Sequence, residues 1–311
     1  MTRFLPVLAI QAPAQAALAS DDYDTFEQAL AVELSDFGPN FGPEAEATPR
    51  LVCYPEMHLC PNAGTPTQRR AQLEAAAEPI DGPRMRALAD IARRHHIWLQ
   101  PGSLCERGED GHLYNTAPVF SPAGECVAAY RKCFPWRPFE PYHPGSAFTV
   151  FDVPGVGRIG LAICYDIWFP EVCRQLAWMG AEVIINPVAT TTSDRAQEQV
   201  LIRANAIFNQ VFVVSVNASA PSGVGESAII DPEGRVRSQL SGANAGTLTD
   251  VLNLDEVTRV RQFGTAGLNR LWSQWREDDP PLELPVYEGR LDPSRWAGQP
   301  ARVETPRPPR R

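Results

Sequence analysis

The chain has 311 residues, of which 44% are hydrophobic, and a formal net charge of -9. This apolar content is enough for a sizeable core, and an acidic chain without a long basic run is a poor match for a nucleic-acid-binding protein. No apolar run approaches the roughly 20 residues that a membrane-spanning helix needs, so no membrane partner is expected. Seven cysteines without framework spacing indicate reduced thiols and a cytoplasmic protein.

Short apolar runs alternate with amphipathic segments through the first half of the chain. The order is a strand at 3–11, a helix at 21–34, a Gly/Pro-rich loop to residue 50, a strand at 51–56, a helix at 82–95 and a strand at 97–104. Two apolar runs on either side of a Ser-Pro-Ala-Gly turn at 121–124 then predict a β-hairpin. Lys132 follows directly after its second strand.

The second half continues the same mixed pattern without an internal repeat. We expect strands at 147–153 and 157–164, a helix from Pro170 to just before Gly180, a strand at 182–188, a helix at 193–209, a strand at 211–217, a hairpin at 226–236 and a closing strand at 246–252. Residues 1–260 are therefore predicted to form one α/β domain. Residues 261–311 are expected to be a C-terminal extension, partly a Pro/Arg-rich tail, that packs on a partner subunit.

Lys132 is the only lysine among the 28 basic residues, and all the others are arginines. On an exposed surface the two residue types are nearly interchangeable. A site that needs a compact ammonium group with three donors on a slim stem cannot accept arginine. The sequence therefore marks Lys132 as a candidate functional residue, and codon bias with one accidental survivor is the alternative.

Three unlike groups stand at predicted strand ends, namely Glu56, Lys132 and Cys164. Side chains at strand ends can converge on one rim of a sheet, where α/β folds place their sites. A cysteine attacks as the thiolate, which a nearby ammonium favours and a carboxylate can generate by taking the proton. The Lys132 ammonium and the backbone N–H of Tyr165 are candidate donors to the oxyanion that such an attack creates.

The motifs "YPE" at 54–56, "YRK" at 130–132 and "GLAICYDIWFPE" at 160–171 resemble those of the nitrilase superfamily of carbon-nitrogen hydrolases. The similarity runs from about residue 4 to about residue 255 and favours an amidase-like branch. It implies a four-layer α-β-β-α sandwich with mixed sheets and subunits that pair through their helical layers. It also implies that Glu56 is the base, Lys132 the oxyanion-binding lysine, Cys164 the nucleophile and Glu140 a supporting glutamate.

The sequence departs from the common pattern near the expected pocket. After Lys132 the chain reads "CFPW" rather than presenting a histidine, and the segment "VATTTSDR" at 188–195 lacks the aromatic residues that many members have there. Its threonines predict a polar wall. The residues that we expect in the substrate pocket are Tyr54, Trp136, Tyr142, Trp168, Thr190 and Arg195.

The expected reaction is hydrolysis of a linear carboxamide through a cysteine thioester, in a homodimer or higher homo-oligomer that needs no cofactor. No metal is expected either, because Cys53, His58 and Cys60 in "CYPEMHLC" lack a second ligand pair. A nitrilase or an N-carbamoyl-amide hydrolase is the alternative within this chemistry, and Arg195 would then bind a substrate carboxylate. From another class, a non-catalytic thiol-bearing interaction or redox protein stays open.

Overall fold

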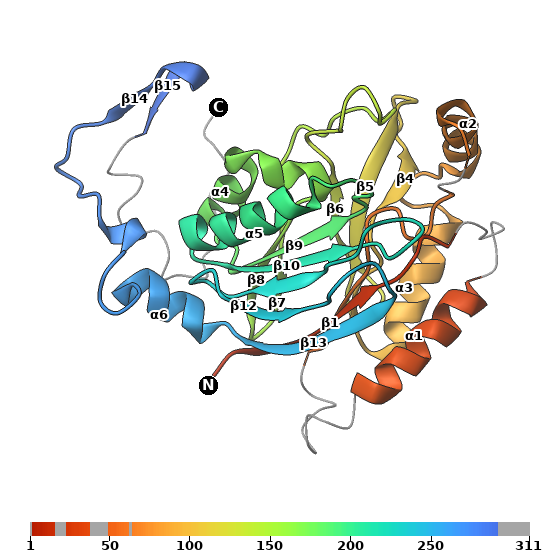
Figure 1. Ribbon diagram of the computed structural model, residues 1–311, viewed down its shortest axis with the longest axis horizontal. Coiled ribbons are helices and arrows are strands. Elements are labelled where there is room, and N and C mark those ends of the chain that lie inside the picture. Colours follow the sequence, from red (N-terminus) through yellow and green to blue (C-terminus); the bar gives the residue numbers. More distant parts are fainter. Residues whose placement is uncertain (1, 16–22, 38–48, 62–63, 292–311) are drawn as a thin grey trace.

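A computed structural model describes residues 2–15, 23–37, 49–61 and 64–291. Two β-sheets stack face to face, and helices cover the outer face of each (Figure 1). The expected helix at 21–34 is α1 (Asp24–Phe37), so it continues into the segment that we expected to be loop. Residues 21 and 22 and most of that loop lie outside the described residues.

The first sheet has seven strands in the order β13-β1-β2-β3-β5-β4, with β6 paired to β5. Their bounds are β1 Phe4–Gln11, β2 Leu51–Cys53, β3 Trp98–Gln100, β4 Leu104–Arg107, β5 Leu113–Phe120, β6 Cys126–Arg131 and β13 Gly246–Asn253. The single strand expected at 97–104 is in fact two strands, because Gly102 between them has a φ of 85°. The closing strand β13 pairs antiparallel with β1 along its whole length, so the two ends of the domain lie side by side.

The second sheet has six strands in the order β12-β11-β10-β9-β8-β7. Their bounds are β7 Val150–Val153, β8 Gly157–Leu161, β9 Val183–Val188, β10 Phe212–Asn217, β11 Ala228–Ile230 and β12 Val236–Gln239. The central strands β8, β9 and β10 are parallel to one another. Covered on both faces, they consist largely of uninterrupted apolar residues, as buried parallel strands do.

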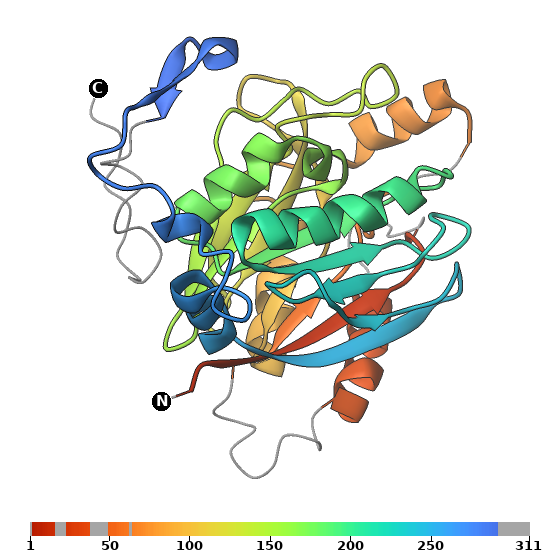
Figure 2. The same cartoon turned by 60° about the vertical axis from the view of Figure 1, so that its left-hand side comes forward.

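The molecule has four layers, and successive side chains of a strand point alternately to the space between the two sheets and to the helices outside. In β1, Leu5 and Val7 point between the sheets, where they join Phe212 and Val214 of β10 in one apolar cluster. Leu8, on the opposite face of β1, belongs to a second cluster with the helices α1 and α3 (Pro83–His95). On the far side α4 (Pro170–Trp178) and α5 (Arg195–Asn209) pack on the second sheet (Figure 2). The α-β-β-α sandwich is therefore confirmed.

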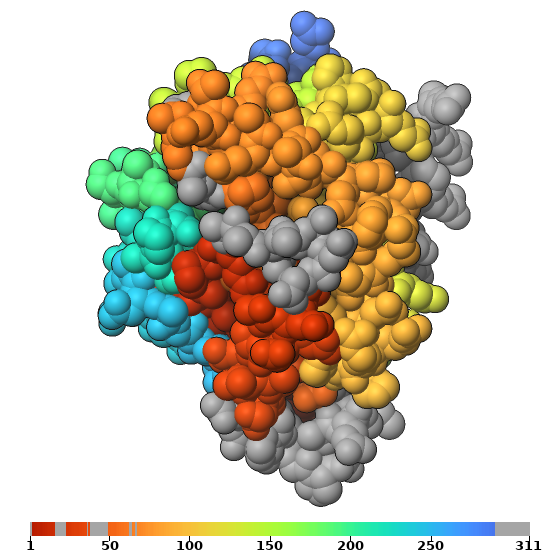
Figure 3. Space-filling model, turned by 90° about the vertical axis from the view of Figure 1, so that its right-hand side faces the viewer, coloured from red at the N-terminus to blue at the C-terminus, as the bar shows by residue number. Residues whose placement is uncertain are grey.

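Helix α2 (Pro66–Ala76) was not predicted from the sequence. It begins with a capping box in which the side chains of Thr65 and Gln68 bond each other's backbone N–H groups. Its surface is polar and mostly exposed, so it lacks the apolar stripe by which α1 and α3 were recognised. Figure 3 looks onto the face of the molecule that carries α1, α2 and α3.

The chain remains packed on the domain beyond residue 260. Helix α6 (Asp255–Phe263) crosses the expected domain boundary, and Trp272 is buried in the same apolar cluster as α4 and α5. The hairpin of β14 (Leu282–Leu284) and β15 (Gly289–Leu291) then lies at the edge of the molecule (Figure 1), and the Tyr287 hydroxyl in its turn donates a hydrogen bond to Glu171 of α4. The Pro/Arg-rich tail lies outside the described residues, and its contact with a partner subunit stays a prediction.

All seven cysteines are free thiols. Within the described ranges, no helix combines the length and the apolar character that crossing a bilayer requires.

Candidate active site

Glu56 lies in the loop that follows β2, and the neighbouring chain fixes this loop closely. Met57 N–H donates a hydrogen bond to the Ser103 hydroxyl at 3.1 Å. A Cβ at position 102 would lie 1.8 Å from the carbonyl oxygen of Pro55, so only glycine allows the two segments to approach this closely. Glu56 is almost fully buried as a result.

Lys132 is the centre of a buried ion cluster. Its Nζ lies 2.9 Å from Glu56 Oε1 and 2.9 Å from Glu140 Oε1, and its side chain is inaccessible to solvent. Asn115 of β5 contacts two members of the cluster: its side-chain amide donates to Glu56 Oε1 at 2.7 Å, and its backbone carbonyl accepts from Lys132 N–H. Burial alone would lower the pKa of Lys132, but Glu56 and Glu140 raise it well above its ordinary value. The side chain therefore remains an ammonium.

Cys164 begins a short 3-10 helix, η3 (Cys164–Trp168), with a φ of 46°. This value is rare for a residue with a side chain and marks a tight turn between β8 and α4. The sulfur is partly exposed to a cavity. Tyr165 is the second residue of η3, and N–H groups in the first turn of a helix have no partner within that helix. The expected position of its N–H is therefore compatible with an oxyanion donor.

Asp166 braces the turn that carries Cys164. Fully buried, it accepts hydrogen bonds from Ile163 N–H, Phe134 N–H and the Tyr130 hydroxyl, each at 2.9 Å. Burial raises its pKa to about 6, although these donors and Lys132 act in the opposite direction. Asp166 thus ties the cysteine turn to the segment that follows Lys132.

Cys164, the expected nucleophile, is favoured as a thiol, whereas we expected the nearby ammonium to favour a thiolate. Burial and the charge of Glu56 raise the pKa of Cys164 well above its ordinary value, and the opposing effect of Lys132 is smaller. The cluster contains two carboxylates and one ammonium, so its field disfavours a thiolate. A base must therefore remove the proton as the sulfur attacks.

The opposite side of Cys164 is bounded by Thr190. Its Oγ1 lies 3.9 Å from Cys164 Sγ and donates a hydrogen bond to Glu198 Oε1 at 2.8 Å. Glu198 Oε2 in turn accepts from Arg195 Nη1 at 3.0 Å. All three of these side chains beyond the sulfur are buried.

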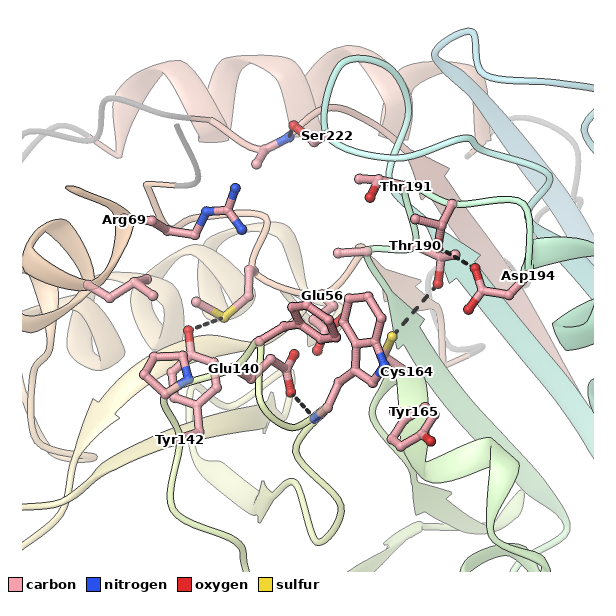
Figure 4. A pocket seen from close by; sticks show the side chains of 18 of the residues that line it. Glu56, Arg69, Glu140, Tyr142, Cys164, Tyr165, Thr190, Thr191, Asp194 and Ser222 are labelled. Atoms are coloured by element: carbon pink, nitrogen blue, oxygen red, sulfur yellow. Dashed lines mark hydrogen bonds between the residues drawn. The ribbon is translucent and has the colours of Figure 1, made fainter. Parts of the chain in front are cut away.

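A cavity of about 460 Å³ opens over these groups (Figure 4). Seven of the predicted site residues line it: Glu56, Trp136, Glu140, Tyr142, Cys164, Tyr165 and Thr190. Lys132 lies just beneath its floor through its contacts with Glu56 and Glu140. The structure thus brings the three strand-end groups together.

Three expected pocket residues do not line this cavity. Tyr54 faces the helices α1 and α3, where its ring stacks on His58 at 4.7 Å between centroids. Trp168 packs against the apolar cluster of α4 and α5. Arg195 is buried behind Thr190 and is engaged by Glu198, so it cannot reach a substrate carboxylate directly.

Four further residues of the site were not predicted from the sequence. Asn115 lies inside β5, Glu198 lies in the first turn of α5, and Asp166 is inside the cysteine motif. Arg69 of α2 lines the cavity mouth with its guanidinium pointing toward the opening (Figure 4). In the described part of the chain, no group of three or more His, Cys, Asp or Glu side chains could hold a metal ion.

Residues 14–262 match the family described as Carbon-nitrogen hydrolase. The chain belongs to this family. It is a carbon-nitrogen hydrolase of the nitrilase superfamily, and family membership argues against the non-catalytic alternative.

The human omega-amidase NIT2 is 31% identical over 202 residues, which are 60% of this chain and 72% of that protein. Among solved structures, Saccharomyces cerevisiae Nit3, a member of branch 10 of the nitrilase superfamily, has the same fold with a TM-score of 0.70 and 24% identity, over 84% of this chain and 94% of that one. The amidase from Nesterenkonia sp. AN1 is 25% identical, with a TM-score of 0.64 and the same coverage. That structure carries the acetamide moiety of fluoroacetamide covalently added at its active-site cysteine.

We expect Asp166→Asn to destabilise the protein, because the Asp166 carboxyl group accepts three hydrogen bonds. Asparagine keeps one acceptor oxygen and turns an NH2 group toward a former donor, so the free energy of unfolding should fall by about 1–3 kcal/mol in urea denaturation. Asp152→Asn is the matched control, because Asp152 is half-exposed in its pair with Arg158 and should cost less than about 1 kcal/mol. Equal losses in the two variants would contradict this role of Asp166.

Proposed function

We propose that the protein hydrolyses a linear primary carboxamide to a carboxylic acid and ammonia through a thioester on Cys164. The observation that carries this proposal is the convergence of Glu56, Lys132 and Cys164 around one cavity. Base, electrophile and nucleophile are then all supplied by side chains. The covalent adduct on the active-site cysteine of the Nesterenkonia amidase supports the same chemistry.

Acylation begins when Glu56 takes the proton of the Cys164 thiol while the sulfur attacks the amide carbon. The carbonyl oxygen becomes an oxyanion, which accepts hydrogen bonds from the Lys132 ammonium and Tyr165 N–H. Lysine has three N–H donors, and Lys132 bonds Glu56 Oε1 and both oxygens of Glu140. It gives up one of the two bonds to Glu140 when it donates to the oxyanion. Glu56 then returns the proton to the nitrogen, the C–N bond breaks, and ammonia leaves.

Deacylation repeats these steps with water. Glu56 removes a proton from a water molecule that attacks the thioester carbon, and the same donors stabilise the second oxyanion. The C–S bond breaks, the carboxylic acid is released, and the sulfur recovers its proton from Glu56. Because the resting thiol has a raised pKa, the cycle ends with Cys164 protonated.

Arg69 supports a substrate whose acyl chain ends in a carboxylate. Among the described residues no ion pair engages its guanidinium. Of the carboxylates that line the cavity, Glu56, Glu140 and Glu198 are held by Lys132 or Arg195, and Asp194 accepts a hydrogen bond from the Thr192 hydroxyl. Guanidinium binds carboxylate through paired donors. The similarity to proteins named omega-amidase and formamidase supports amide hydrolysis. The N-carbamoyl alternative loses its candidate residue with the burial of Arg195.

We also propose that the protein acts as a cytoplasmic homodimer. Val200, Ile207 and Phe208 on the outer side of α5 are exposed apolar residues, and a second copy of the chain is the simplest partner to cover them. The seven free thiols support a reducing compartment.

The thioester is tested by acid quench during turnover of an amide, followed by mass spectrometry of the digested protein. We expect an added mass equal to the acyl group on the peptide that contains Cys164. Cys164→Ala should show neither adduct nor turnover, while Cys133→Ala, which removes another partly exposed thiol, should retain both. An adduct on Cys133, or turnover by Cys164→Ala, would refute the assignment.

The substrate class is tested by Arg69→Gln. Loss of an exposed charge-assisted bond should raise KM about tenfold for the monoamide of a four- or five-carbon dicarboxylic acid. KM for a neutral primary amide of the same length should change less than about twofold, because that substrate has no carboxylate. Arg70→Gln is the control, since Arg70 pairs with Glu74 and does not line this cavity. Equal changes for both substrates would exclude carboxylate recognition by Arg69.

A further inference from the structure

Thr190 lies on the side of Cys164 that faces away from the Lys132 cluster, and its hydroxyl oxygen points toward the sulfur. Its Oγ1 lies 3.9 Å from the sulfur, and Figure 4 shows the two side chains facing each other across the cavity floor. The residue is only 7% exposed, and its backbone N–H donates to Asn217 Oδ1 at 2.9 Å. The hydroxyl is therefore held at a fixed place beside the nucleophile.

The contacts of Glu198 determine which way the Thr190 hydroxyl is polarised. Glu198 Oε2 accepts from the buried guanidinium of Arg195, and its Oε1 accepts from Thr190 at 2.8 Å. A carboxylate paired with a guanidinium is an acceptor at both oxygens, so the Thr190 proton is committed to Glu198. The hydroxyl oxygen consequently offers only lone pairs toward Cys164 and the cavity.

A buried ion pair lowers stability unless its remaining donors and acceptors also have hydrogen-bond partners. The pair of Arg195 and Glu198 has such partners. Arg195 also donates to the backbone carbonyls of Gly225 at 3.2 Å and Glu226 at 2.7 Å. The arrangement keeps Glu198 in position as an acceptor without exposing its charge to the substrate. Thr190 is the residue of the hydrogen-bonded series Arg195–Glu198–Thr190 that lies beside the Cys164 sulfur.

We propose that Thr190 accepts a hydrogen bond from the amide nitrogen of the substrate and so selects carboxamides, an inference that rests on the proposed function. The oxyanion side of the site is provided with donors, Lys132 and Tyr165 N–H, whereas Thr190 provides an acceptor. An N–H directed at Thr190 turns the nitrogen lone pair toward Glu56, which must deliver a proton there before the C–N bond breaks. An ester oxygen has no hydrogen and gains nothing from this contact.

The test compares kcat/KM for a primary amide with kcat/KM for the methyl ester of the same acid. The value of kcat/KM is used because it reports the steps of each reaction up to and including acylation. In Thr190→Val the amide value should fall about tenfold, the effect of one hydrogen bond of about 1.4 kcal/mol, and the ester value less than about twofold. Thr190→Ser, which keeps the hydroxyl, should retain the wild-type amide-to-ester ratio within about threefold.

Glu198→Gln tests whether the direction of the Thr190 hydroxyl hydrogen bond matters. The new amide can donate to Thr190 Oγ1, which frees the threonine proton to point at the substrate, so this variant should lower the amide-to-ester ratio as Thr190→Val does. Ser193→Ala removes an exposed hydroxyl from the same loop that does not line the cavity, and it should change the ratio less than about twofold.

Equal losses for amide and ester in Thr190→Val would mean a structural role and would overturn the proposal, as would an unchanged amide rate. Failure of the proposed function is a separate outcome, because it would appear as a wild-type protein without amide turnover or as an active Cys164→Ala variant.

Discussion

A single ammonium buried between two carboxylates is the interaction on which the site depends. Lys132 has no solvent exposure in its side chain, so its charge is tolerable only while Glu56 and Glu140 remain within hydrogen-bonding distance. Those partners come from separate loops, one after β2 and one after β6. The need to pair the ammonium therefore holds both loops against the first sheet, and the second sheet delivers Cys164 to the same rim.

The same cluster also acts on the protonation state of Cys164, the proposed nucleophile. Burial is the largest cause that raises the pKa of the Cys164 thiol, and the charge of Glu56 adds to it, so the thiol is stabilised over the thiolate. In the proposed mechanism the thiol keeps its proton until a substrate brings its carbonyl close to Glu56 and the sulfur. Activation is then coupled to substrate binding. Thr190, an acceptor held by Glu198, complements the donors on the oxyanion side.

The family resemblance carried by three motifs predicted the fold and its four layers, and the strand ends predicted the convergence of Glu56, Lys132 and Cys164. Local pattern could not identify Asn115 or Glu198, because a polar residue inside a strand or helix reveals its partner only after folding. The same ambiguity misled the pocket prediction at Tyr54 and Trp168, since aromatic residues near strand ends serve cores as often as pockets. Arg195 was predicted to face the substrate, and its burial depends on Glu198 three residues later on α5.

The most direct test of the account is single-turnover acylation of Cys164 in Lys132→Arg, measured by mass spectrometry on protein shown to be folded by circular dichroism. Guanidinium is larger, planar and forked, so it cannot replace the ammonium between Glu56 and Glu140 and still donate to the oxyanion. Loss of such a donor typically costs about 10²- to 10³-fold, and we predict a fall in the acylation rate of at least about a hundredfold. Acylation within about threefold of the wild-type rate would contradict the account. Lys132 would then be an accident of composition.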